Sequence, residues 1–289
     1  MLQKSIWLST VGLGLMLAAP AAGDVIYNNL TPNNQIAIAT RPESATGFEI
    51  EAGDDFLLNG ETLITNASFT GLFVSPTGGP VTVSDLVIEI YRVFPNDSDT
   101  VRTPAVPTRM NSPSDVAFES RDSAGGDLIF TTAPQAPTFT ALKSIQPGGI
   151  ALNTGGNPAI TGQEVQLNVT FSVPFDLPAD HYFFVPQVLL SGGGQFFWLS
   201  ASRPISGSGT TPFAPDLQAW TRDEALDPDW LRVGTDIVGG GASAPQFNAA
   251  FSLSGSAVPE PTSVVLLMSM LVMLGLLWRR RGRQAKAEK

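Results

Sequence analysis

Alternation of apolar and polar side chains constrains this chain more than any other feature. Between Val165 and Val173 every second residue is apolar, and the residues between them are Gln, Asn, Thr and Ser. Successive side chains of a strand point to opposite faces, so this spacing predicts a strand with one buried face. The second half of residues 83–94 alternates in the same way. Strands, rather than helices, are therefore the expected building blocks.

Further segments have the composition of strands, at residues 61–74, 127–132, 138–145, 181–190, 195–200 and 247–253. Turns rich in Pro, Gly, Asn and Asp separate them. Many short strands joined in this way predict an all-β fold, an antiparallel β-sandwich or jelly-roll-like body over residues 24–256. One domain is the default, and a split near residues 153–158 stays open. We expect residues 95–114 to form a surface insertion and residues 254–257 to form a linker.

The absence of cysteine, with only one histidine, limits the chemistry of the chain. Disulfide frameworks, thiol nucleophiles and cysteine-ligated zinc sites need residues that the chain lacks. A Ser-His-Asp triad would have to use His181, which opens a predicted strand, and no Gly-x-Ser-x-Gly motif occurs. We therefore expect His181 to be structural or on the surface. Paired carboxylates of a secreted glycoside hydrolase remain an alternative, because sequence does not give their spacing.

The net charge of −10 is divided unevenly along the chain. Between Asp24 and Thr262 there are 25 acidic and nine basic residues, so this segment carries −16. Nucleic-acid recognition needs a basic face, which argues against a nucleic-acid partner. The basic residues are concentrated at the end of the chain, in Arg279, Arg280, Arg281 and Arg283.

The first 23 residues have the order of a secretory signal peptide. Lys4 precedes an apolar stretch from Ile6 to Ala19, and small residues follow up to Gly23. The stretch is shorter than the ~20 residues that a membrane helix needs. We expect export through the Sec translocon and removal of residues 1–23 by signal peptidase.

The other end has three parts in a fixed order. The motif segment, residues 258–263, contains Pro259, Glu260 and Pro261. The uncharged residues 264–278 follow, and then the basic tail, residues 279–289. Residues 264–278 are expected to form one short transmembrane helix, with bilayer thinning covering its deficit in length. The positive-inside rule places the arginine cluster in the cytoplasm and the acidic body outside.

These three parts together resemble the PEP-CTERM sorting signal of exported bacterial proteins. The resemblance covers roughly the last thirty residues. It implies that an exosortase, a membrane-embedded transpeptidase, recognises Pro259, Glu260 and Pro261, and that the chain is cut near this motif. It also implies inner-membrane anchoring before the cut and a later location at the cell surface or outside the cell. A permanent, uncut membrane anchor is the alternative.

Two acidic loops of the body are weaker candidates for ligand sites. Asp97 and Asp99, and in a second acidic loop Asp223, Asp227 and Asp229, could offer oxygen ligands to calcium. Neither loop matches an EF-hand, and solvated acidic loops are the commoner explanation. Otherwise we expect no cofactor.

Trp220 and Trp230 flank the second acidic loop and could form an exposed platform for sugar rings, while Trp198 is expected in the core. The expected role is structural or adhesive and not enzymatic, in the envelope, biofilm or extracellular polysaccharide. A carbohydrate-binding module is the first alternative and a secreted hydrolase the second.

Overall fold

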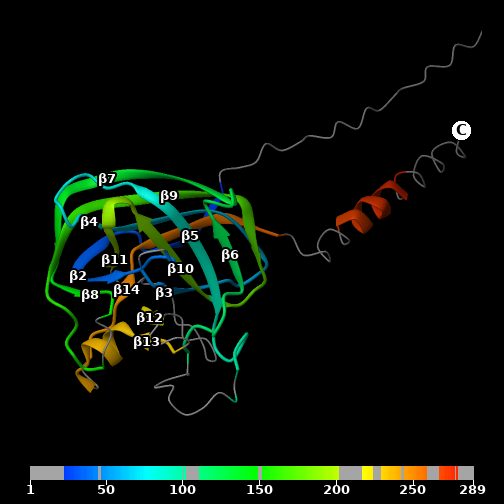
Figure 1. The fold of residues 1–289 in the computed structure, drawn as a ribbon. Coiled ribbons are helices and arrows are strands. Elements are labelled where there is room, and N and C mark those ends of the chain that lie inside the picture. Colours follow the sequence, from blue (N-terminus) through cyan, green and yellow to red (C-terminus); the bar gives the residue numbers. More distant parts are fainter. Residues whose placement is uncertain are drawn as a thin grey trace, which may run out of the picture.

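The computed structural model describes residues 23–44, 47–99, 101, 111–148, 152–201, 217–223, 229–241, 244–258, 267–276 and 278. The body is all-β, as predicted, and its strands form two sheets (Figure 1). The signal peptide, apart from Gly23, and the basic tail lie outside the described residues.

Nine strands form the larger sheet: β1 (Asp24–Asn28), β2 (Pro32–Ala39), β4 (Thr62–Val74), β7 (Leu128–Ala141), β8 (Lys143–Ile145), β9 (Ile160–Leu177), β11 (Gln195–Ala201), β14 (Asn248–Ala249) and β15 (Phe251–Ala257). The long strand β4 lies in its middle and pairs with β9, β11 and β15. The pairs are antiparallel except β2 and β8, which run parallel. The expectation of a purely antiparallel body was therefore wrong at this edge.

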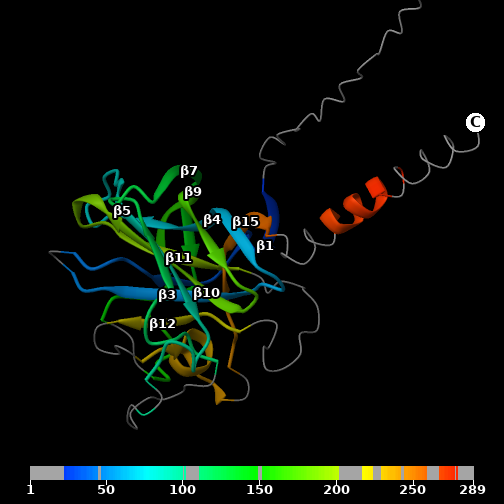
Figure 2. The same ribbon diagram turned by 90° about the vertical axis from the view of Figure 1, so that its right-hand side faces the viewer.

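Six strands form the smaller sheet: β3 (Ile50–Leu57), β5 (Val83–Arg92), β6 (Glu119–Asp122), β10 (His181–Leu190), β12 (Trp220–Asp223) and β13 (Leu231–Arg232). Their order is β13-β12-β3-β10-β5-β6. Figure 2 shows β5, β10, β3 and β12 side by side in this sheet. The described part of the body also contains the short helical turns η1 (Ser191–Gly193) and η2 (Val233–Val238).

The main core lies between the two sheets. Phe184 of β10 stacks on Phe251 of β15 with ring centroids 5.1 Å apart, and it meets Phe69 and Trp198 edge-to-face. All four rings are fully buried, which confirms the expected place of Trp198. Contacts between aromatic rings of facing sheets are what close a β-sandwich, because each sheet needs a partner for its apolar face.

Two details of the sequence prediction were wrong. Residues 254–257 are not a linker, because they belong to β15 and pair with β4 as far as Ala257 opposite Thr62. The segments 127–132 and 138–145 are not two separate strands either, because β7 runs without interruption from Leu128 to Ala141. In the described part of the chain β7 pairs with β9 alone, so its two prolines, Pro134 and Pro137, sit where edge strands tolerate missing N–H groups.

The C-terminal helix covers residues 267–276 and includes Trp278 (red in Figure 1). Its apolar side chains are exposed on every side, at 55–66% for the described Leu, Met and Val residues. Within the described residues, no helix is both long and apolar enough to cross a bilayer.

Candidate functional site

The outer face of the six-stranded sheet is a second buried layer. Its apolar part consists of Tyr91, Val93, Phe183, Val185, Leu217, Trp220 and Trp230. The segment around Ser112 and Ser114 is also buried, and the indole N–H of Trp230 donates to the Ser114 carbonyl at 3.0 Å. Loop segments therefore cover this face, and the charged residues on it lie in a largely dry environment.

Glu51 and Arg222 form a buried ion pair at the centre of this layer. They lie opposite each other in the β3–β12 register, and the Arg222 guanidinium donates from Nε to the Glu51 carboxylate. Arg222 also donates to the Tyr91 hydroxyl at 2.9 Å and to the Asp115 carbonyl at 3.1 Å. Its guanidinium lies 4.6 Å from the centre of the Trp230 ring. Burying a charge requires such partners, because an unpaired ion loses its hydration without compensation.

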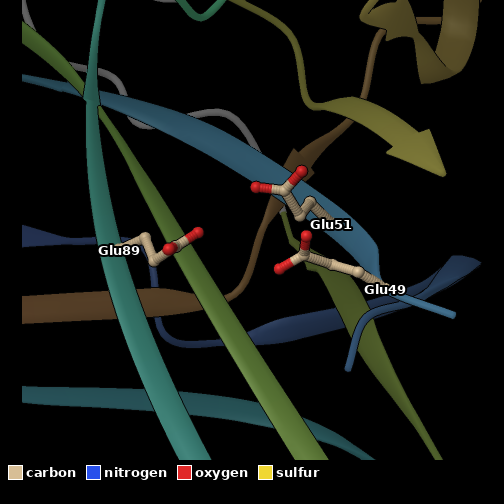
Figure 3. Close-up of side chains that lie close together, drawn as sticks. All are labelled: Glu49, Glu51 and Glu89. Carbon is tan, nitrogen blue, oxygen red and sulfur yellow. The ribbon is translucent and has the colours of Figure 1, made fainter. Parts of the chain in front are cut away.

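Two further carboxylates, Glu49 and Glu89, approach Glu51 at the rim of the layer. Oxygen atoms of the three side chains lie within 4.8 Å of one another, and Figure 3 shows Glu89 reaching from β5 toward the other two. The buried Gln187 amide donates to Glu49 at 3.0 Å and lies 3.4 Å from the Glu89 carboxylate. We call Glu49, Glu51 and Glu89 the carboxylate cluster.

The cluster holds more negative charge than its partners neutralise. Burial, with repulsion from Glu51 and Glu49, raises the pKa of Glu89 to about 8. Burial and the neighbouring Glu51 also raise the pKa of Glu49. Glu89 is therefore expected to be protonated at neutral pH.

The hydrogen bonds of the Tyr91 hydroxyl independently support protonation of Glu89. This oxygen lies 2.6 Å from Glu51 and 3.0 Å from Glu89, and it also accepts a bond from Arg222. One hydroxyl hydrogen cannot serve two carboxylates. If Tyr91 donates to Glu51, a protonated Glu89 can donate to Tyr91, and every contact then has one hydrogen. Burial and the adjacent Glu51 and Glu89 also raise the pKa of Tyr91, which keeps it neutral.

Chemically, a set of close carboxylates can share a proton or coordinate a hard cation. Arg222 and Tyr91 already occupy the Glu51 oxygens, so a cation would have to compete with an internal positive charge. A proton on Glu89 explains how the three carboxylates can lie close together without a bound cation.

His181, the residue that a hydrolytic triad would need, is structural in its surroundings. It is buried, and its Nε2 lies 2.5 Å from the Asp55 carboxylate. The other Asp55 oxygen accepts the Leu217 backbone N–H at 2.8 Å. This pair therefore ties β3, β10 and the segment before β12 together, as the structural interpretation of His181 anticipated.

The expected sugar platform is wrong for Trp220 and Trp230. They are 2% and 1% exposed, so neither indole can present a face to a ring in solution. The acidic residues between them suggested an exposed loop, but both indoles belong to a buried cluster with Tyr91, and Trp230 also packs against Arg222.

The proposed calcium ligands are not brought together where the structure describes them. Asp97 pairs with Arg92, Asp99 accepts the Val101 N–H at 2.9 Å, and Asp223 is buried in β12. Asp229 is half-buried, and Asp227 lies outside the described residues. The acidic group that the described residues do assemble is the carboxylate cluster. Sequence reasoning missed it because Glu49 and Glu51 lie around the start of β3 whereas Glu89 lies on β5, and the local signal was a run of acidic residues inside the apolar stretch 50–57.

The sorting residues follow directly after the last strand. The Val258 N–H donates to the Glu61 carbonyl at 2.8 Å, which extends the β15–β4 pairing by one residue. Pro259, Glu260, Pro261 and the cluster Arg279, Arg280, Arg281 and Arg283 lie outside the described residues. Residues 257–281 match the family described as the PEP-CTERM protein-sorting motif.

The chain carries a PEP-CTERM protein-sorting motif. The motif indicates an exported protein that is sorted to the cell surface, with an exosortase as its processing partner. The match begins at Ala257, so the sandwich before it is not part of the matched family. Searches of curated proteins and of solved structures gave no match.

Proposed function

We propose that this PEP-CTERM protein is anchored in the inner membrane by residues 264–278 until an exosortase cuts it near Pro261. The released β-sandwich then serves a structural or adhesive role in the envelope or extracellular matrix. The observation that carries the proposal is the match of residues 257–281 to the sorting motif, directly beyond the last strand.

The position of the motif suits removal of the tail. The final backbone bond of the sheet, from Val258 to Glu61, ends one residue before Pro259. Proline lacks a backbone N–H and disfavours helix at the preceding residue, so the prolines at 259 and 261 make continuation of β15 or of a helix through the motif unfavourable. A cut at or after Pro261 therefore leaves all strands of the sandwich paired.

The C-terminal helix supports a stay in the membrane before the cut. Its exposed Leu, Met and Val side chains make no contact with the core of the body. Apolar surface of this extent is unfavourable in water and favourable in lipid. The arginines at 279–283 would then meet the anionic cytoplasmic leaflet.

A non-catalytic role fits the buried contacts that the charged residues of the outer layer make with one another. Arg222 and Tyr91 hold Glu51, and Asp55 holds His181, within buried contacts of the fold. The hydrolase alternative predicts glycosidase activity that a Glu89→Gln or Glu49→Gln variant loses. A screen on chromogenic glycosides without turnover supports the proposed role, and turnover that depends on either carboxylate contradicts it.

The sorting proposal is tested on material collected from the surface of cells that express the chain. Mass spectrometry should find a C-terminus near Pro261 and no peptides from residues 264–289. The double variant Pro259→Ala/Pro261→Ala should stay full-length in the membrane fraction. The matched control is Pro76→Ala/Pro80→Ala, because these prolines lie exposed in the turn between β4 and β5. Surface material from the control should be cut normally.

Recovery of intact wild-type chain from the membrane, with the arginines still attached, would contradict cutting and support a permanent anchor. Equal cutting of both double variants would show that the motif is not what the processing enzyme reads.

A further inference from the structure

Part of the outer face of the nine-stranded sheet, over β1, β15, β4, β9 and β7, is open and almost free of charge, beside an apolar cluster that buries Leu72 and Phe197. One row of aligned residues crosses five strands, from Asn28 through Ser252, Ser68 and Asn168 to Thr131. The next row contains Ser254, Asn66 and Thr170. Hydroxyl and amide groups thus lie side by side on neighbouring strands in an otherwise acidic body.

At one end of this face the surface is hollowed to about 340 Å³. Its lining consists of Asn28, Leu30, Thr31, Pro32, Thr70, Gln135, Glu164 and Gln166. The volume lies at the lower end of the ~300–1,000 Å³ that is usual for small-molecule sites. The lining combines hydroxyls, amides and one carboxylate with a small apolar patch, and it contains no basic residue.

Several polar groups of this hollow are left without partners by the fold. Thr70 is only 2% exposed, yet no residue of the described chain hydrogen-bonds its hydroxyl. Glu164 makes no ion pair or hydrogen bond within the described residues, and burial raises its pKa. Gln166 uses its amide N–H to bond Asn168 at 2.6 Å, which leaves its carbonyl oxygen available. Glu164 and Gln166 are partly exposed, so their free oxygen atoms can exchange water for a ligand that enters the hollow.

We propose that this hollow, with the neutral rows beside it, binds a neutral polysaccharide, one sugar unit of which enters the hollow. The polysaccharide would be the partner in the adhesive role proposed above, and its biological meaning rests on that role. Sugar hydroxyls both donate and accept, so they match a carboxylate, amides and hydroxyls in one site. Leu30 and Pro32 can face the C–H groups of the ring.

The charge of the hollow favours a neutral polysaccharide over an anionic glycan or a metal cation. An anionic glycan would meet Glu164 and a body with an excess of acidic residues, without any lysine or arginine to bind its carboxylates. A hard cation needs several oxygen ligands with more than one negative charge, and this lining supplies one carboxylate. A neutral polysaccharide is not repelled by Glu164 and does not need several anionic ligands.

The test uses the full-length protein in a detergent without a sugar headgroup. Probes are neutral oligosaccharides of glucose, mannose and galactose, with alginate and hyaluronan oligosaccharides as anionic probes. At least one neutral series should bind. Gln166→Ala and Glu164→Ala should each weaken that binding by about tenfold, the size expected when hydrogen bonds of a desolvated polar group are lost. Thr70→Val tests the unpaired hydroxyl with little change in shape.

The matched control is Gln163→Ala, on the same strand but outside the hollow and exposed. It should bind like wild type, and thermal unfolding should show that all variants fold. Absence of binding to every neutral probe overturns the proposal. So does binding that Gln166→Ala and Glu164→Ala leave unchanged, or a preference for anionic probes that Glu164→Gln strengthens. These outcomes concern purified protein and leave the sorting result, measured on cell-surface material, unaffected.

Discussion

The two sheets of the sandwich differ in how much of their outer faces they cover and in which side chains lie there. The six-stranded sheet buries its outer face under loop segments, and this layer contains Glu51, Arg222 and His181 with four large aromatic rings. The nine-stranded sheet leaves the part of its outer face over β1, β15, β4, β9 and β7 open and lines it mainly with Ser, Thr, Asn and Gln, whereas Leu72, Phe197 and Leu199 are buried in an apolar cluster on the same face. Charge is therefore concentrated where water is excluded, and neutral polar groups are placed where water has access.

This contrast distinguishes a face whose side chains stabilise the fold from a face whose side chains can bind a partner. A buried charge is stabilised only by specific neighbours, so each residue of the covered layer is tied to the others. Hydroxyls and amides in contact with water cost little and can exchange water for a ligand. Perturbing the covered layer should thus affect folding, whereas perturbing the open face should affect binding.

The largest expected effect is the loss of stability caused by Arg222→Ala. It leaves the buried Glu51 carboxylate without its cation and removes the stacking on Trp230. Breaking a buried ion pair in this way costs about 3–5 kcal/mol. Denaturant unfolding of the variant should show a decrease of that size in the free energy of unfolding.

The matched control is Arg232→Ala, which removes a partly exposed partner of Asp236 in the same sheet. Such pairs contribute about 0–1 kcal/mol. The double variant Glu51→Gln/Arg222→Met should be more stable than Arg222→Ala, because it no longer buries an unpaired charge. If Arg222→Ala and Arg232→Ala cost the same, the covered layer is not the dry environment described here.

A smaller effect is expected from pH, through Glu89. Its pKa is near 4.5 in the unfolded chain and about 8 in the fold, so the folded state holds a proton that the unfolded state has lost. Stability from this group is complete below pH 4.5 and is lost as the pH rises toward 8. The facing groups are Glu49 and Glu51 from the β3 side, Tyr91 on β5, Gln187 on β10 and Arg222 on β12.

Since one pKa unit corresponds to about 1.4 kcal/mol, we expect the loss to exceed ~1 kcal/mol between pH 5 and 8. Glu89→Gln should flatten this part of the pH profile, because glutamine keeps the shape and has no proton to lose. Glu61→Gln, a change at an exposed position, should leave the profile as in wild type. A Glu89→Gln profile as steep as wild type would show that Glu89 does not carry the proton.

Alternation and apolar composition predicted the longer strands, including β10 and β11, which are buried on both faces, and missed strands that contain buried charged residues or are very short. The segments 61–74, 181–190 and 195–200 correspond to β4, β10 and β11 within one or two residues. Strand β3 was missed because Glu51, Asp54 and Asp55 are buried within it, which the pattern treats as a polar stretch. Short strands such as β12 and β13 owe their conformation to pairing with distant strands, which no local window contains.

The candidate sites also differ in whether their residues are close together in the sequence. The sorting motif was identified because its parts are contiguous in sequence. The carboxylate cluster and the hollow are assembled from distant strands, so their residues meet only after the sheets form. Trp220 and Trp230 misled for the same reason, since burial beneath a covering segment depends on contacts with Tyr91 and Ser114 that lie more than 100 positions away.

The smallest effect on stability is expected on the open face, for Asn168→Ala. Asn168 accepts hydrogen bonds from Ser68 at 2.9 Å and from Gln166 at 2.6 Å, but all three side chains keep contact with water. Water can replace the lost bonds, so the cost should stay within about 0.5 kcal/mol. The neighbouring Leu167 is fully buried, and Leu167→Ala should cost about 2–5 kcal/mol in the same measurement. A cost above 1.5 kcal/mol for Asn168→Ala would show that the polar rows hold the sheet together. In that case their side chains would not be free to exchange water for a polysaccharide, and the distinction between the two outer faces would fail.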